Sequence, residues 1–209
     1  MKTIILNGSP RKDWNTALLL KSAKEGAEAA GAETEYIDLF DLKYAGCRSC
    51  LACKRKGVPE PCRCYYQDEL TPVLERVWQA DRLILGSPIY FGEPTGQLRN
   101  FLERIIFPAL SYNSFSTVFQ GKVDVDVFLT MNAPEEAYEK LYRVKMEEYF
   151  EPFRLLRGDI RIHPVWDTVQ VRDYSKFEMA GIDGAKKQAR HDALFPDALS
   201  QAFEIGKKN

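Results

Sequence analysis

Short apolar segments alternate with helical patterns along this chain, and that alternation limits its fold more than any other feature. Residues 3–6 are almost wholly apolar, as in a strand that is covered on both faces. Strand patterns recur at 33–39, 82–86, 123–130 and 160–171, and helical spacing occurs at 15–30, 68–80, 96–106, 134–150 and 184–205. Strands that alternate with helices imply βαβ units. The sequence therefore predicts an α/β fold, with a doubly wound parallel sheet and helices on both faces.

Length and composition restrict the class of protein. The 209 residues suffice for one domain, so we expect 1–209 to form a single domain, with a cysteine-rich loop at 46–66 and a C-terminal extension from about residue 172. The formal net charge of −1 gives no reason to expect binding to nucleic acid or to an anionic membrane. No apolar run approaches the roughly 20 residues that span a bilayer, and the opening residues lack a signal-peptide pattern. We expect a cytoplasmic protein.

The loop after the first strand has the features of a phosphate site. It joins the strand to a helix, and unpaired N–H groups at a helix N-terminus attract anions. Ser9, Asn15 and Thr16 add side-chain donors, and Arg11 adds a guanidinium suited to phosphate. The loop lacks the glycine patterns of triphosphate and dinucleotide sites, which favours a monophosphate. The alternative is that Ser9 and Asn15 only cap a turn and a helix.

The loop after the third strand, residues 86–93, is suited to a flat redox heterocycle. Glycine and proline favour a tight turn, and Tyr90 and Phe91 lie at its tip. Such a heterocycle needs an apolar wall and N–H groups near its polar edge. Residues 130–133 follow the fourth strand, so all three loops are expected at one edge of the sheet. The alternative is that the aromatic side chains belong to the core.

Taken in order, these two loops and the following segment Gln97-Leu-Arg-Asn-Phe-Leu-Glu-Arg104 resemble the flavodoxin-like NAD(P)H-dependent FMN reductases. The resemblance covers nearly two-thirds of the chain. It implies a five-stranded sheet of order 2-1-3-4-5 and non-covalent FMN. It assigns the phosphate to Ser9, Arg11, Asn15 and Thr16, the isoalloxazine ring to Pro88, Ile89, Tyr90, Phe91 and Gly92, and further flavin contacts to Thr130 and Asn132. It also implies a homodimer or homotetramer, for which the aromatic-rich residues 107–119 are a candidate contact.

All five cysteines lie in the 46–66 loop, and clustered thiols in a reducing compartment favour metal or redox chemistry. The spacing Cys47-x-x-Cys50-x-x-Cys53 resembles the iron–sulfur flavoprotein branch of the same superfamily. That resemblance implies a 4Fe-4S cluster on Cys47, Cys50, Cys53 and Cys62, with Cys64 as the alternative fourth ligand. The gap after Cys53 is longer than in that branch. Free redox-active thiols, or a zinc site with Cys62-x-Cys64 as its second arm, remain as alternatives.

The resemblance implies an FMN-dependent oxidoreductase that accepts electrons from NAD(P)H or another reduced donor. It would pass them to a small-molecule or protein acceptor, with the cysteine loop as a possible relay. We assign no catalytic side chain, because the flavin carries the chemistry. No separate nicotinamide motif occurs, so a nicotinamide would stack on the flavin transiently. The alternatives are a flavodoxin-type electron carrier without an organic substrate and a zinc-stabilised binding module.

Overall fold

The computed structural model describes residues 1–58 and 62–208, so three residues of the predicted cysteine-rich loop lie outside the described part. Five parallel strands form the sheet in the order β2-β1-β3-β5-β6, and a short strand, β4, pairs antiparallel with β3. The strands are β1 (Lys2–Asn7), β2 (Glu33–Asp38), β3 (Arg82–Tyr90), β4 (Glu93–Pro94), β5 (Val123–Thr130) and β6 (Arg157–Val165). With β4 set aside as a hairpin arm, this confirms the predicted fold class and strand order.

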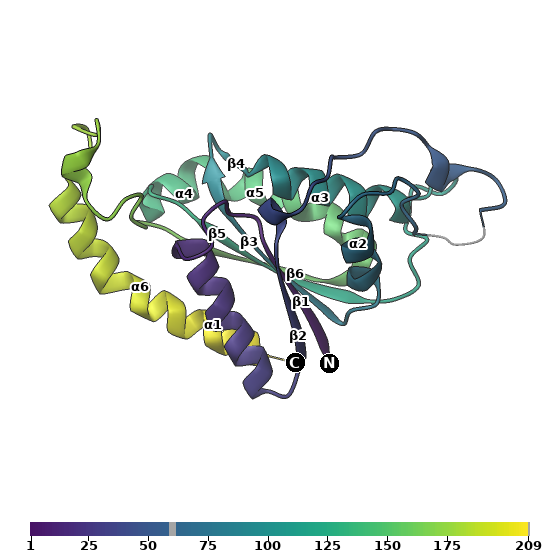
Figure 1. Cartoon of the computed structure of the whole chain (residues 1–209), viewed down its shortest axis with the longest axis horizontal. Coiled ribbons are helices and arrows are strands. Elements are labelled where there is room, and N and C mark those ends of the chain that lie inside the picture. The colour runs from purple at the N-terminus through teal and green to yellow at the C-terminus, as the bar shows by residue number, and fades with distance from the viewer. Residues whose placement is uncertain (59–61, 209) are drawn as a thin grey trace.

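Helices cover both faces of the sheet (Figure 1). One face carries α1 (Asn15–Ala29) and α6 (Gly184–Lys207), and the other carries α2 (Thr71–Trp78), α3 (Gly96–Ile106), α4 (Glu135–Leu141) and α5 (Arg143–Phe150). Short 3-10 turns occur at Leu39–Asp41, Ala52–Lys54, Phe107–Ala109, Glu151–Leu156 and Tyr174–Lys176. Two apolar clusters result, a large one beneath α2 and α3 and a smaller one between the sheet and the α1–α6 pair.

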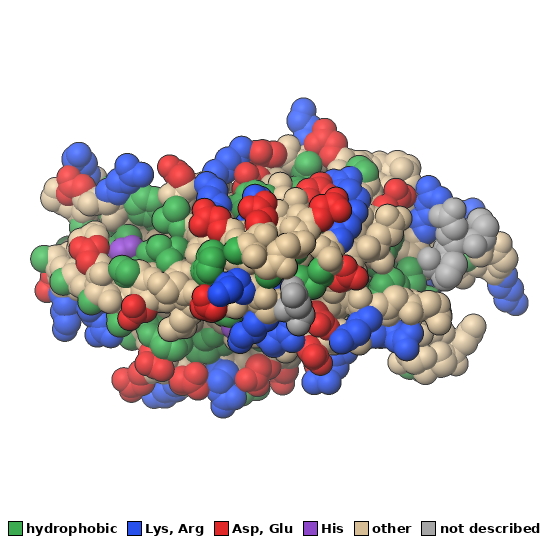
Figure 2. Space-filling model, turned by 90° about the horizontal axis from the view of Figure 1, so that it is seen from below, with side chains coloured by type: hydrophobic (Ala, Val, Ile, Leu, Met, Phe, Trp, Pro, Cys, Tyr) green, Lys and Arg blue, Asp and Glu red, His purple; other side chains and the backbone are tan. Residues whose placement is uncertain are grey.

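Helices α1 and α6 pack closely because glycine lies at their contact. A Cβ built on Gly206 would lie 2.0 Å from the Ala23 carbonyl oxygen, so a larger residue would force the helices apart. The outer surface of this pair carries positive and negative side chains interspersed, without a single-sign patch (Figure 2). Within the described residues, none of the helices is long and apolar enough to cross a membrane.

A buried carboxylate in the centre of the sheet ties α6 to the strands. Asp126 of β5 accepts hydrogen bonds from Arg82 Nε (2.8 Å) and Arg161 Nε (3.0 Å), and its Oδ1 lies 2.7 Å from His163 Nε2. Arg82 also donates to the carbonyls of Ile205, Gly206 and Lys208 at the end of α6. Burial alone would raise the pKa of Asp126, but these hydrogen bonds and the Arg82 charge hold that pKa well below its usual range.

Three predicted elements differ from the structure. The third strand was expected over 82–86, but β3 continues to Tyr90, because Ile89 and Tyr90 pair with β4. The last strand was expected over 160–171, but β6 ends at Val165, and Asp167 takes a left-handed conformation (φ 55°) that turns the chain out of the sheet. The helix expected over 134–150 is interrupted at Tyr142 (φ −122°), which separates α4 from α5. Both interruptions bring residues to the edge of the sheet where β1, β3 and β5 end.

Candidate functional site

A pocket of about 330 Å³ lies beyond the carboxyl ends of β1, β3 and β5. Parallel α/β sheets bind ligands at this edge, near the point where strand order reverses. All eleven residues predicted to contact the flavin line this pocket: Ser9, Arg11, Asn15, Thr16, Pro88, Ile89, Tyr90, Phe91, Gly92, Thr130 and Asn132. The structure thus brings together three loops that are far apart in the sequence. The volume of the pocket is in the range of small-molecule binding sites.

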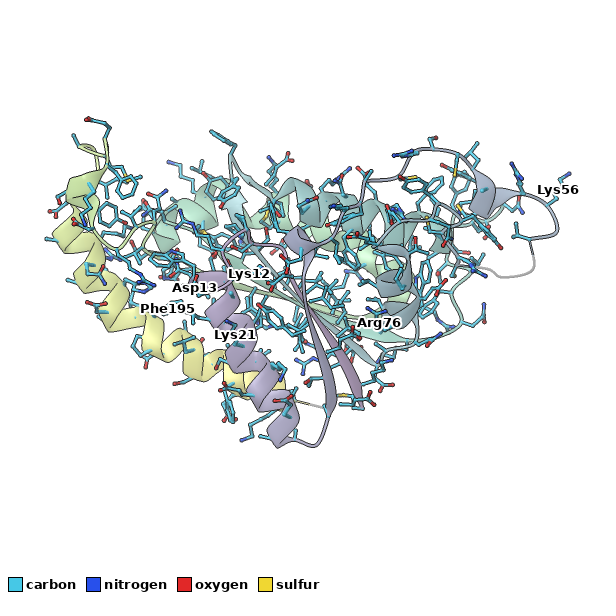
Figure 3. The ribbon with its side chains drawn as sticks, viewed as in Figure 1. Lys12, Asp13, Lys21, Lys56, Arg76 and Phe195 are labelled. Atoms are coloured by element: carbon cyan, nitrogen blue, oxygen red, sulfur yellow. The ribbon has the colours of Figure 1, made fainter. Side chains whose placement is uncertain are left out.

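The β1 end of the pocket is built to receive an anion. Helix α1 begins there without a side-chain cap and without an acidic residue in its first turn, so its first N–H groups remain available. Asn7 Oδ1 accepts from the Ser9 amide (3.0 Å), and Ser9 Oγ accepts from the Arg11 amide (3.1 Å), which braces the loop. Figure 3 shows Lys12 and Asp13 in this loop, just before the helix. The geometry suits a phosphate group.

Hydroxyl contacts join the phosphate end to the neighbouring strand. The hydroxyl oxygens of Thr16 and Thr130 lie 2.7 Å apart, and both side chains are buried. Thr16 comes from α1, and Thr130 is the last residue of β5. Two predicted site residues from distant parts of the sequence therefore hold each other in place.

A tight hairpin between β3 and β4 forms the other end of the pocket. Phe91 (φ 52°) and Gly92 (φ 78°) are both left-handed, and the Phe91 side chain is fully exposed. Ser87 Oγ accepts from the Thr95 amide (3.0 Å), and Thr95 Oγ1 donates to the Gly8 carbonyl (2.6 Å). These buried contacts fix the hairpin against the phosphate loop. The alternative reading, in which Tyr90 and Phe91 belong to the core, is wrong, because both side chains are exposed.

One wall of the pocket is not predicted from the sequence. Residues after β6 contribute Thr168, Val169, Gln170 and Val171, and Trp14, Met131, Ala133, Tyr142 and Met179 complete the lining. The early end of β6 explains the omission, because 166–171 was assigned to a strand. Val169 and Val171 continue the apolar alternation past Val165, so the sequence carries no signal that the strand ends there.

Four cysteines gather around a second, much smaller cavity of about 20 Å³, which is lined by Cys47, Cys50, Cys53 and Cys64 together with aromatic and charged neighbours. Cys62, the predicted fourth ligand, instead lines a different cavity beside Trp78 and Phe119. The geometry therefore groups Cys64, not Cys62, with the other three thiols.

Two cations, Arg48 and Arg104, line this small cavity together with Glu103, and Lys54 lies close to the cysteines. Arg104 of α3 is buried, pairs with Asp68 Oδ2 (2.7 Å) and donates from Nε to Cys64 Sγ (3.1 Å). Lys54 Nζ donates to the carbonyl of Phe107 (2.6 Å), and burial lowers its pKa. Such cations favour a thiolate over a neutral thiol.

The thiols do not converge on a metal in this structure. Across residues 1–58 and 62–208, no group of three or more Cys, His, Asp and Glu side chains has the arrangement of a metal site. A cavity of about 20 Å³ holds little more than one water molecule. Burial raises the pKa of the Cys53 thiol, and it raises the pKa of the Cys62 thiol to about 11. The four thiols are the donor set of an iron–sulfur cluster, but the loop would have to rearrange to bring them onto one.

The strand order and the pocket define a flavodoxin-like α/β protein. Residues 1–133 match the family model for NADPH-dependent FMN reductase, and the chain belongs to that family. Within it, the chain is 38% identical over 104 residues to an iron-sulfur flavoprotein of Methanocaldococcus jannaschii, covering 50% of this chain and 51% of that one. It is 30% identical over 146 residues to an iron-sulfur flavoprotein of Archaeoglobus fulgidus, covering 69% and 62%. The chain thus spans about half to three-fifths of the length of these relatives.

Solved structures share the fold over the whole chain. The NAD(P)H:quinone oxidoreductase from Methanothermobacter marburgensis superposes with a TM-score of 0.74 at 19% identity, covering 100% of this chain and 98% of that one. An FMN-dependent NADH-azoreductase from Bacillus anthracis, solved in complex with FMN, gives 0.62 at 15% identity and covers 99% and 98%. At these identities the likeness establishes the fold alone.

Proposed function

We propose that this protein binds FMN in the pocket beyond β1, β3 and β5 and acts as an NAD(P)H-dependent oxidoreductase. The observation that carries the proposal is the convergence of eleven predicted contact residues, from three separate loops, on one pocket. An uncapped helix N-terminus with no acidic residue in its first turn lies at one end, and an exposed aromatic hairpin lies at the other. That polarity matches a molecule with a phosphate at one end and a flat ring at the other.

Each loop has a separate task in this proposal. Ser9, Arg11, Asn15 and the first turn of α1 bind the phosphate, and Thr16 and Thr130 hold that end against β5. The hairpin residues 88–92 flank the ring and present backbone N–H groups to its polar edge. When bound, FMN supplies two-electron chemistry with a reduced nicotinamide. The protein positions the ring and leaves one side accessible, and no side chain acts as acid or base.

Anaerobic stopped-flow mixing of the FMN-loaded protein with NADH and with NADPH tests the activity. We expect the absorbance of the oxidised flavin to disappear on the timescale of enzyme turnover, because the nicotinamide reduces the flavin. Flavin that stays oxidised with both nicotinamides, but is reduced by a reduced ferredoxin, would overturn the reductase proposal and favour an electron carrier.

We propose separately that the cysteine loop binds an iron–sulfur cluster. The support is the donor set of four thiols beside two cations and the naming of two relatives as iron-sulfur flavoproteins. Because the thiols do not converge in the structure, no electron-transfer step is assigned to the loop. Iron, sulfide and zinc content of anaerobically purified protein decides the matter: iron with sulfide supports the cluster, zinc alone supports the zinc alternative, and neither metal leaves free thiols.

We further propose a cytoplasmic homo-oligomer. The fully exposed Phe91 lies at the mouth of the pocket, and Leu141 and Val144 add exposed apolar surface on α4 and α5. A second copy that covers Phe91 would remove a large aromatic ring from water. Five clustered, unpaired cysteines suit a reducing compartment. Light scattering should give at least twice the chain mass of 24.0 kDa, and a monomer that retains FMN would refute the oligomer.

A further inference from the structure

The loop after β6 is attached to the loop after β5 along its length. The Asp167 amide donates to the Ala133 carbonyl (3.0 Å), and both the amide and the hydroxyl of Thr168 donate to the Met131 carbonyl (3.0 Å each). Asn132 Nδ2 donates back to the Thr168 carbonyl (3.3 Å). The two loops therefore form one double-layered wall of the pocket.

The same wall touches the donors at the phosphate end. Asn15 Nδ2 and Trp14 Nε1 both donate to the Val169 carbonyl, at 2.8 and 3.0 Å, and Arg11 donates to the Gln170 carbonyl. These backbone oxygens therefore accept from Asn15 and Arg11, two of the side chains that are assigned to the phosphate. The position of 167–170 therefore decides how Asn15 and Arg11 are oriented.

One side chain outside the pocket clamps both layers of this wall. Lys187 of α6 donates from Nζ to the Asn132 carbonyl (2.5 Å) and to Asp167 Oδ1 (2.7 Å), and both Lys187 and Asp167 are largely buried. Asp167 is held in a left-handed conformation (φ 55°), which a non-glycine residue keeps only where its surroundings enforce it. The two hydrogen bonds of Lys187 hold Asp167 in this conformation.

Arg190 offers an internal comparison. Its Nη2 lies 2.7 Å from Asp167 Oδ2, so it neutralises the same carboxylate, but the contact lacks hydrogen-bond geometry and the Arg190 side chain is half exposed. Among the contacts found for the described residues, Arg190 reaches only the loop after β6, whereas Lys187 bridges both loops. Arg190 therefore only neutralises the Asp167 carboxylate, whereas Lys187, one helical turn away, also connects the two loops.

We propose that Lys187 is a positioning residue of the cofactor pocket. It holds the Asn132 carbonyl and the Asp167 carboxylate at a fixed spacing, and so couples helix α6 to FMN binding. No described residue of α6 lines the pocket, and the coupling therefore passes through the wall. Coupling between two sites is reciprocal, so FMN must stabilise the first half of α6 as much as the clamp favours FMN. This inference rests on the proposed FMN site.

The test compares Lys187→Met, which keeps an unbranched apolar side chain but removes the charge and donors, with Arg190→Gln. Titration of apoprotein with FMN, followed by flavin fluorescence, gives the Kd. We expect the Kd of Lys187→Met to rise at least about tenfold, and that of Arg190→Gln to stay within about threefold of the wild type. A Lys187→Arg variant, which restores charge and donors, should recover part of the affinity. Equal affinity of Lys187→Met and wild type, or an equal loss in both variants, would overturn the proposal.

Hydrogen exchange on the wild-type protein tests the same coupling without a variant. Saturating FMN should slow exchange of amides in 188–195, in the first half of α6, and leave those near the C-terminus of α6 unchanged. Protection confined to the pocket loops would overturn the inference while leaving FMN binding intact. Wild-type protein that does not bind FMN would instead overturn the proposed function, so the two failures are distinguishable.

Discussion

The pocket beyond β1, β3 and β5 and the cysteine loop were both predicted from motifs, yet their side chains are organised differently. The pocket residues follow parallel strands whose register fixes where each loop starts, and all of them reach one cavity. The cysteines lie in one irregular loop, with left-handed backbone at Ser49, Leu51 and Cys62, and they surround a cavity too small for a cluster. A sheet places residues relative to one another, whereas an irregular loop needs its own contacts, or a ligand, to do so.

The largest effect should come from removing the cation that braces the cysteine loop. Arg104→Met leaves the nearly buried Asp68 carboxylate without its partner, which costs about 3–5 kcal/mol of unfolding free energy. Chemical denaturation measures this loss. Affinity for FMN should stay within about threefold, since none of the hydrogen-bond partners of Arg104 among the described residues lines the pocket. A loss of stability below about 1 kcal/mol, or a large change in FMN affinity, would contradict the separation of the two regions.

A negative charge at the phosphate end should weaken FMN binding and leave the stability of the fold almost unchanged. Asn15→Asp puts a carboxylate in the first turn of α1, and we expect FMN to bind about 100-fold more weakly, roughly 2.7 kcal/mol. Stability of the apoprotein should change by less than about 1 kcal/mol, because the helix dipole offsets the lost hydrogen bond to the Val169 carbonyl.

Isothermal titration calorimetry measures that affinity. Asn113→Asp makes the same chemical change in an exposed loop and serves as the control. Tight FMN binding by Asn15→Asp would show that the phosphate does not lie at the N-terminus of α1.

Acidification should lower the free energy of unfolding by disrupting the contacts of Asp126 in the sheet beneath the pocket. The folded-state pKa of Asp126 lies below its ordinary value of 3.8, so its contribution to stability is present above about pH 4 and is lost as pH falls from there towards the folded pKa. We expect a loss of roughly 2–3 kcal/mol over that interval. Denaturation midpoints of wild type and Asp126→Asn between pH 6 and 2 test this. The variant should be less stable at pH 6 and should lose less on acidification, and parallel pH profiles would refute the assignment.

The smallest effect is expected at the hairpin. Gly92→Ala places a Cβ at φ 78° and 3.3 Å from Tyr142 Cε1, which costs about 1–2 kcal/mol in backbone strain. Part of that strain should appear as weaker FMN binding, by about fivefold. Gly96→Ala is the matched control, because a Cβ there meets nothing within 4 Å. If both variants bind FMN with the affinity of the wild type, the conformation of the hairpin does not contribute to FMN binding.

These two regions also show how far sequence reasoning reaches. The apolar strands predicted a parallel sheet, the resemblance to the FMN reductases implied its strand order, and the positions of Ser9, Pro88 and Thr130 near strand ends predicted that their loops meet. The wall around Thr168 and Val169 was missed because an apolar pattern does not reveal where a strand leaves the sheet. The choice between Cys62 and Cys64 depends on the path of an irregular loop and on Arg104, 40 residues away in the sequence from Cys64. The spacing of the cysteines reveals neither the path of this loop nor the contact of Cys64 with Arg104.

Paired titrations of the apoprotein with FMN and with riboflavin would test the phosphate assignment most directly, since the two ligands differ only in the phosphate group. If the N-terminus of α1 binds that group, FMN should bind at least about 100-fold more tightly than riboflavin, through several charge-assisted hydrogen bonds. That preference should disappear in Asn15→Asp. Equal affinity of the wild-type protein for the two flavins, or binding of neither, would contradict the assignment of this pocket to FMN.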